Sequence, residues 1–170
     1  MEPRITSESV TLAGIQKVLQ FSKDRFDLVL PQLRRTLLQG LDDIPDRSAS
    51  LRMFGYWQFI DQDTRVYFAG VQVDDLDRFP SCHPSGTLPW DLSRALIGWS
   101  LGPTTFAVFQ RHGVGDTSPF YGEIPSGYAY DSRFVGDFEV ISYAPWLAAG
   151  EVPNLPESDN EVWIPVRPSG

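Results

Sequence analysis

The sequence predicts one α+β domain, in which an amphipathic helix packs on an antiparallel sheet. Apolar residues recur at spacings of three, four and seven between Phe26 and Leu38, which indicates a single helical stripe. Runs in which apolar residues alternate with other types lie on both sides of this stretch and predict strands. With 170 residues and 42% hydrophobic content, the chain can bury one substantial core. We therefore treat residues 1–170 as a single domain.

The N-terminal half has the order strand, helix, strand, strand. VTLAGIQKV is rich in β-branched and apolar residues, which are typical of a strand. The helix between Phe26 and Leu38 is expected to end at Gly40. LRMFGYWQF and RVYFAGVQV follow, separated by IDQDT, and predict a hairpin. Gly55 and Gly70 are expected to leave room in that hairpin for the close approach of a ligand or a helix.

A connector at residues 74–103 is longer than such a fold needs. Helical spacing within it predicts a short added helix that contains Leu92, Ala95, Leu96 and Trp99. Trp90 and Trp99 are interpreted as core residues, with ligand stacking as the alternative. Cys82 and His83 lie among prolines, so we interpret them as part of a surface loop. No metal site and no cofactor are predicted.

The C-terminal half holds three strand-like runs, TTFAVFQRHG, DFEVISYAP and NEVWIPVRP. Residues 114–126 lie between the first two runs and contain two prolines and two glycines. At most two turns of helix fit there, because proline and glycine both oppose a helix interior. The order of elements repeats that of the N-terminal half, although no residue-level repeat is strong.

Alternation along two of these runs gives the candidate site. In DFEVISY, Glu139 lies on the face opposite Phe138, which is expected to face the core and the helices. In EVWIPV, Glu161 and Trp163 share a face. If the two strands pair, both carboxylates fall on one side beside large aromatic residues, which is a pattern typical of a ligand pocket. The alternative is that this face is solvated and both glutamates are ordinary surface residues.

Charge and motifs exclude several function classes. The formal net charge of -8 and the sequence pI near 4.6 argue against direct nucleic-acid binding, which requires a clustered basic face. No signal peptide and no apolar run near the ~20 residues of a membrane span are present, so we expect a cytoplasmic chain without membrane association. Common hydrolase, metalloprotease and nucleotide-binding motifs are absent from the sequence.

The succession of FAVFQRHG, GEIPSGY, DFEVISY and EVWIPV resembles the GyrI-like small-molecule-binding domain, which is also the effector-binding domain of AraC-type and MerR-type multidrug regulators. The order of elements in the N-terminal half fits as well. This resemblance implies two βαββ units in a pseudo-twofold arrangement. It also implies an antiparallel curved sheet with helices on one face and a ligand groove between the units. A separate regulator or a second copy is the expected macromolecular partner.

The resemblance makes stand-alone binding of a lipophilic, cationic or aromatic small molecule the preferred function. Glu139 is then the central ligand carboxylate and Glu161 the substitute for it. The aromatic residues expected to line the ligand site are Trp57, Tyr67, Phe109, Tyr143 and Trp163. Because an unpaired buried carboxylate opposes folding, Glu139→Gln is expected to preserve or raise stability.

Two alternatives remain open from the sequence. Some GyrI-like proteins are hydrolases that open cyclopropane rings of DNA-alkylating natural products, and Glu139 or Glu161 is the expected base in that case. The second alternative is a protein-binding inhibitor of the gyrase-inhibitor type.

Overall fold

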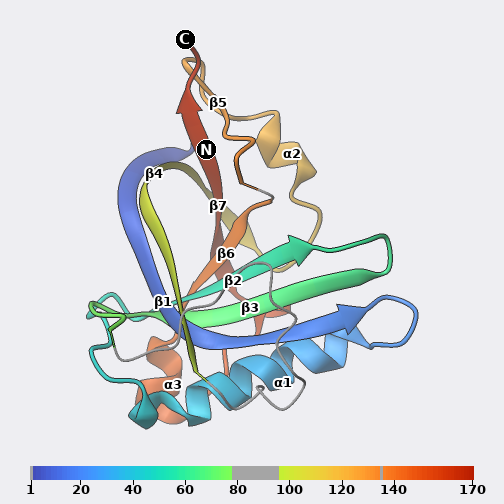
Figure 1. The fold of residues 1–170 in the computed structure, drawn as a ribbon, viewed down its shortest axis with the longest axis vertical. Helices are drawn as coiled ribbons and strands as arrows, with labels where there is room; N and C mark the ends of the chain where they lie inside the picture. The colour runs from blue at the N-terminus through green and yellow to red at the C-terminus, as the bar shows by residue number, and fades with distance from the viewer. Residues whose placement is uncertain (1, 78–95, 135) are drawn as a thin grey trace.

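The computed structural model describes residues 2–77, 96–134 and 136–170 (Figure 1). The first half contains β1 (Arg4–Gln20), α1 (Phe26–Gln39), a short 3-10 turn (Leu41–Asp43), β2 (Arg52–Phe59) and β3 (Thr64–Gln72). The second half contains β4 (Ile97–His112), α2 (Ser118–Tyr121), β5 (Tyr128–Tyr130), β6 (Phe138–Ser142), α3 (Ala144–Ala149), a 3-10 turn (Leu155–Glu157) and β7 (Asp159–Pro168).

The strands form one antiparallel, curved sheet. Their order is β4-β1-β3-β2-β6-β7-β5, and β4 also pairs with β7. These pairings link six strands in a ring, with β5 added at the edge of β7. The series β1-β3-β2 in the first half matches β4-β7-β6 in the second, with β2 and β6 paired at the junction. The predicted α+β fold of two βαββ units in a pseudo-twofold arrangement is confirmed.

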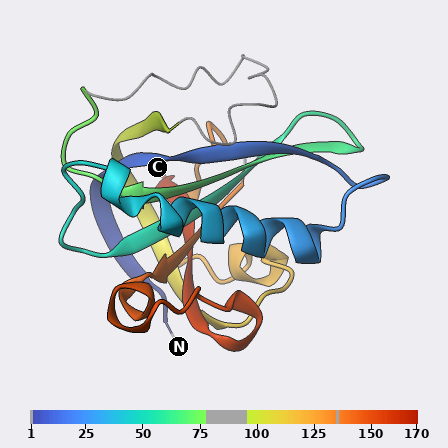
Figure 2. The ribbon, with the colours of Figure 1, turned by 90° about the horizontal axis from the view of Figure 1, so that it is seen from below.

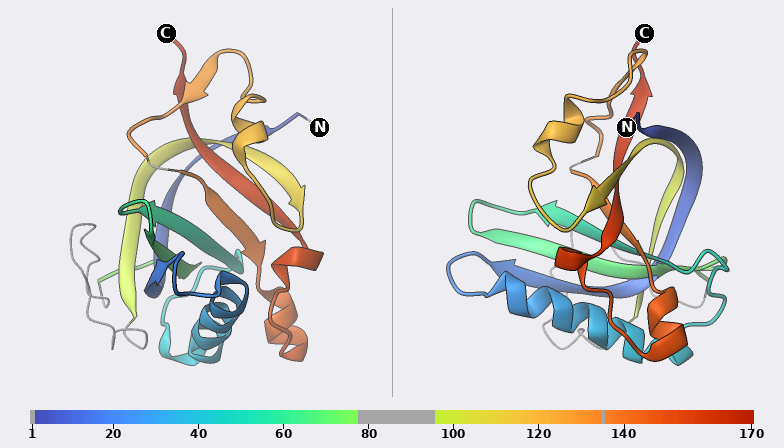
Figure 3. Two further views of the ribbon diagram at one scale, coloured as in Figure 1. Left: turned by 90° about the vertical axis from the view of Figure 1, so that its right-hand side faces the viewer. Right: turned by 180° about the vertical axis from the view of Figure 1, so that it is seen from behind.

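One face of the sheet carries the helices, and we call it the helix-covered face. Leu33, Leu37 and Leu38 of α1 are buried against apolar side chains of the first three strands. Trp146 of α3 packs on the same cluster, and Phe120 of α2 packs on side chains of β4 and β7. Figure 2 shows α1 lying along the sheet, and Figure 3 shows α3 beside α1 with α2 at the far end near β5.

The opposite face lies inside the ring of strands, and we call it the interior face. Each of the six linked strands contributes a large buried side chain to it: Leu12, Phe54, Phe68, Phe106, Phe138 and Trp163. The rings contact one another at centroid distances that include 5.4 Å for Phe54–Trp163 and 5.2 Å for Phe106–Trp163. The high aromatic content of the sequence is therefore used largely to fill this interior.

One element differs from expectation in the connector region. The predicted helix is wrong from Ile97 onward, because Ile97, Trp99 and Leu101 belong to β4. Trp99 pairs with Leu12 of β1, so these three apolar residues follow a strand's period of two. The four-residue α2 confirms that only a short helix fits between residues 114 and 126. Trp90, Cys82 and His83 lie outside the described residues.

Aromatic rings of β3 occupy the space that Gly55 and Gly70 leave. A Cβ atom on Gly55 would stand 2.1 Å from the Tyr67 hydroxyl, on the helix-covered face. A Cβ atom on Gly70 would stand 2.6 Å from the Phe68 ring, on the interior face. The space left by both glycines is therefore filled by neighbouring side chains of β3, and not by the ligand or helix expected from the sequence.

Candidate functional site

Glu139 lies on the helix-covered face, between two arginines that come from different halves of the chain. Its Oε2 accepts a hydrogen bond from Nη2 of Arg111, on β4, at 2.9 Å. Its Oε1 lies 3.9 Å from Nη2 of Arg34, on α1. The side chains of Glu139, Arg34 and Arg111 keep only 13%, 6% and 8% of their surfaces exposed. We call these three side chains the Arg–Glu–Arg cluster.

Neighbouring groups hold both arginines in place. Arg111 Nε donates to Oδ1 of Asn160 at 2.9 Å, and the Asn160 amide donates to the Gly113 carbonyl at 2.8 Å. Arg34 Nη2 donates to the Tyr67 hydroxyl at 3.3 Å, and its guanidinium lies over the Tyr67 ring. The Tyr67 hydroxyl in turn donates to Glu139 Oε1 at 3.5 Å. The cluster is therefore tied to β3, β4, β7 and α1.

Tyr67 is fully buried beside the cluster, and this burial raises the pKa of its hydroxyl to about 12. It is neutral at ordinary pH and acts as a hydrogen-bonding group, not as a charge. The Trp57 ring contacts Tyr67 at a centroid distance of 4.6 Å and stacks on Phe26 at 5.6 Å. The structure thus brings together three predicted site residues, Glu139, Tyr67 and Trp57.

The predicted orientation of the β6 side chains is wrong. Phe138 points to the interior face, where it stacks on Tyr56, while Glu139 points towards the helices. The expectation that Glu161 shares a face with Glu139 is also wrong. The β6–β7 pairing places Glu139 opposite Val162 and Val140 opposite Glu161. Since directly paired residues share a face, Glu161 lies with Val140 on the interior face.

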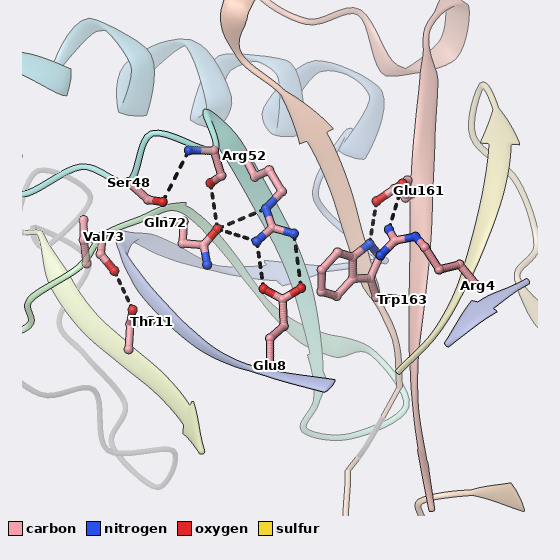
Figure 4. Close-up of polar contacts among 10 residues, drawn as sticks. Arg4, Glu8, Thr11, Ser48, Arg52, Gln72, Val73, Glu161 and Trp163 are labelled. Atoms are coloured by element: carbon pink, nitrogen blue, oxygen red, sulfur yellow. Dashed lines mark hydrogen bonds and ion pairs between the residues drawn. The ribbon is translucent and has the colours of Figure 1, made fainter. Parts of the chain in front are cut away.

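Glu161 has its own partners on the interior face (Figure 4). Its Oε2 accepts from Trp163 Nε1 at 2.8 Å, and its Oε1 accepts from Gln110 at 2.8 Å and from Arg4 at 3.4 Å. A second polar group, also visible in Figure 4, consists of Arg52 paired with Glu8 at 2.8 Å and hydrogen-bonded to Gln72. These contacts join side chains of β1, β2, β3, β4 and β7.

Most of the aromatic residues predicted to line the ligand site are core residues. Tyr67, Tyr143, Trp163 and Phe109 are at most 3% exposed, whereas Trp57 is partly exposed. Burial raises the pKa of the Tyr143 hydroxyl, which has no hydrogen-bond partner among the described residues. A ligand role for these aromatic residues and for Glu139 stays a prediction.

A pocket of about 260 Å³ opens on the interior face, and its walls are mostly aromatic and apolar. Its residues are Gln16, Tyr56, Gln58, Val66, Phe68, Trp99, Ser100, Leu101 and Phe134. Cross-strand pairs of β1, β2 and β3 form the floor, because Phe68 lies opposite both Gln16 and Tyr56. Trp99 of β4 contacts the Tyr56 ring at 5.7 Å and the Phe68 ring at 6.3 Å. We call this the interior pocket.

Sequence reasoning missed Tyr56, Phe68 and Phe134 of the interior pocket and gave ligand stacking by Trp99 only as an alternative. Tyr56 and Trp57 are adjacent in β2 and point to opposite faces, and the predicted site contains only Trp57. The spacing that predicts a helix from Leu92 includes Trp99, which instead lies in β4. The alternation of Ile97, Trp99 and Leu101 was the signal that indicates a strand and an inward-facing indole.

No protein-family model and no curated protein matches the chain. Among solved structures, SAV2435 bound to tetraphenylphosphonium has a TM-score of 0.57 at 14% identity, over 98% of this chain and 94% of that chain. A Staphylococcus aureus MU50 protein with a suggested role in transcription regulation has a TM-score of 0.53 at 14% identity, over 98% and 99%. EcmrR in a DNA complex has a TM-score of 0.55 at 11% identity, and the match spans 98% of this chain but 57% of that one.

At these identities the likeness is one of fold, and the GyrI-like fold expected from the sequence is confirmed. None of the helices in the described residues is long and apolar enough to cross a membrane.

Proposed function

We propose that this chain is a small-molecule-binding domain for lipophilic aromatic molecules, cations among them, and that they occupy the interior pocket. The observation on which the proposal rests is a pocket of about 260 Å³ whose described lining includes Tyr56, Phe68, Trp99 and Phe134 and no charged side chain. Flat apolar molecules gain most in such a site, since ring faces give both area and stacking geometry. Aromatic faces also attract organic cations without a carboxylate.

The structural neighbours support the same class of function. SAV2435 shares the fold along almost its whole length, and its structure contains a lipophilic aromatic cation. The fold also makes up part of the EcmrR chain, which was solved with DNA. The proposal therefore includes a separate regulator as a partner for this domain.

Glu139 is a weaker candidate for the ligand carboxylate than the sequence indicated. A cationic ligand would have to compete with Arg34 and Arg111, which already contact both of its oxygens. Both oxygens of Glu161 are engaged as well, by Trp163 on one side and by Gln110 and Arg4 on the other. No observation favours activation of water by either carboxylate, so we propose binding without turnover.

Tryptophan fluorescence tests the proposal, because Trp99 lies in the interior pocket and Trp57 lies on the other face. Titration with tetraphenylphosphonium and with neutral naphthylmethanol should give saturable quenching, and both compounds should be recovered unchanged. Trp99→Leu should weaken binding about tenfold, as loss of a central aromatic contact does, while Trp57→Leu should change it little.

Three results would count against this proposal. Quenching that does not saturate would exclude a defined site. A loss of affinity in Trp57→Leu alone would place the ligand on the helix-covered face. Conversion of the ligand would show an enzyme.

A further inference from the structure

The Arg–Glu–Arg cluster carries more positive than negative charge in a nearly closed space. Two guanidinium groups face one carboxylate, and each of the three side chains is at least 87% buried. Tyr67 adds no charge, because its hydroxyl is neutral at ordinary pH. An uncompensated buried charge opposes folding unless an opposite charge approaches it.

Asp137 does not supply the missing charge. It precedes Glu139 by two residues, and its Oδ2 accepts hydrogen bonds from the hydroxyls of Thr117 at 2.8 Å and Tyr121 at 3.0 Å. Within the described parts of the chain, no ion pair joins it to Arg34 or Arg111. Among the described residues, the excess of one positive charge therefore remains at the cluster.

Both arginines keep donors that no described residue uses. Arg34 makes its contacts through Nη2, which leaves Nε and Nη1 unbonded within the described chain. Arg111 uses Nε and Nη2, which leaves Nη1 unbonded there. In the same residues, the Tyr143 hydroxyl is the only fully sealed side-chain polar atom without a partner. The unbonded guanidinium nitrogens are therefore not completely sealed, and the Arg34 and Arg111 side chains keep 6% and 8% of their surfaces exposed.

An aromatic surface borders the cluster on the side of Arg34. The Arg34 guanidinium lies 5.7 Å from the centre of the Tyr67 ring. Trp57 continues the aromatic surface from Tyr67 to Phe26, and its side chain is only partly buried. A ring attached to an acidic group therefore has an aromatic face to contact at the edge of the cluster.

We propose that Arg34 and Arg111 bind the carboxylate of an aromatic organic acid, whose ring lies against Trp57. Guanidinium groups offer paired N–H donors that match the two oxygens of a carboxylate, and such charge-assisted bonds are strong in a partly desolvated site. Glu139 pairs with Nη2 of each arginine, and the ligand carboxylate binds the donors that remain. This site lies on the face opposite the interior pocket and depends on different residues, so either site can fail without the other.

Three ligands with one ring system test the charge preference on the Trp99→Leu protein, in which binding to the interior pocket is weakened. Naphthylacetate, naphthylmethanol and naphthylmethylammonium share their aromatic group and differ in charge. Calorimetry should show naphthylacetate binding at least about tenfold more tightly than the neutral and cationic compounds, with an affinity that falls as salt rises. Equal affinity for acid and alcohol would overturn the proposal, as would displacement of naphthylacetate by an equal concentration of inorganic phosphate.

Substitutions then locate the site. Arg34→Gln should weaken naphthylacetate binding about tenfold or more, and Glu139→Gln should strengthen it, because the competing carboxylate is lost. Arg4→Gln is the matched control, since it removes one positive charge from an exposed position on the interior face and should change little. Unchanged affinity in Arg34→Gln, or weaker binding in Glu139→Gln, would contradict the proposal. If Arg34→Gln does not fold, Glu139→Gln and the three-ligand comparison still decide.

Discussion

The Tyr67 hydroxyl stands where a side chain on Gly55 would be, 2.1 Å from the ideal Cβ position. Gly55 is also the cross-strand partner of Glu139. The absence of a side chain on Gly55 therefore lets the Tyr67 ring cross β2 and bring its hydroxyl to Glu139 and Arg34. One glycine in β2 thus fixes a hydrogen-bonding group beside the Arg–Glu–Arg cluster.

Gly55→Ala should destabilise the fold by about 1–3 kcal/mol, because overpacking forces a buried ring from its position. Tyr67 is 1% exposed and has little space into which it can shift. Gly102→Ala is the control, since nothing lies within 4 Å of its added Cβ atom. Urea unfolding of both variants measures the difference, and equal midpoints would show that Tyr67 moves freely.

Glu139→Gln should lower stability, contrary to the expectation from the sequence. The carboxylate is paired with two buried arginines, and its loss leaves their positive charges facing each other. We expect a cost of about 2 kcal/mol or more. The matched control is Glu8→Gln, because its pair with Arg52 is 25% exposed on both sides and should contribute only about 0–1 kcal/mol. A Glu139→Gln protein as stable as the wild type would argue that water already screens the cluster.

Alkaline pH should weaken the fold partly through Tyr67. Its folded pKa of about 12 lies above the unfolded value of 10, so the folded state favours the protonated hydroxyl. The associated stability is fully present below pH 10 and is lost as pH rises towards 12, to a total of roughly 2–3 kcal/mol. Tyr67→Phe should flatten this decline in unfolding free energy. An identical pH slope in the two proteins would show that Tyr67 is not the buried titrating group.

Trp163 should contribute to stability and not to ligand binding. Its ring is fully buried among Phe54 and Phe106, and its Nε1 donates to Glu161. Trp163→Phe leaves a small cavity and an unused acceptor, which should cost about 1–3 kcal/mol. Naphthylmethanol affinity, measured well below the unfolding midpoint, should stay within about twofold, since Trp163 does not line the interior pocket. A selective loss of affinity would instead support the expectation from the sequence that Trp163 lines the ligand site.

Local patterns were enough to predict much of the fold. The helical stripe from Phe26 to Leu38 corresponds to α1, and the period-two run around Glu139 corresponds to β6. Both patterns involve side chains only a few residues apart, so they can be recognised in the sequence without knowledge of tertiary contacts.

The alternation of residue types along one strand does not predict which side chains of different strands and helices meet at the site. A register in which Glu139 pairs with Val162 sets the face of Glu161, and a shift of one residue would reverse it. Arg34 and Arg111 reach Glu139 from positions 105 and 28 residues away in the sequence, so no local pattern links them to it. The sequence therefore gave no reason to predict that Glu139 was already paired.

The most direct test of the central claim is a crystal structure of the protein with a bromine-labelled naphthylmethanol, in which anomalous scattering locates the bromine. We expect a bromine peak in the interior pocket, with the naphthyl ring between Tyr56 and Trp99. A peak beside Trp57 and Glu139, with no ligand density between Tyr56 and Trp99, would contradict it.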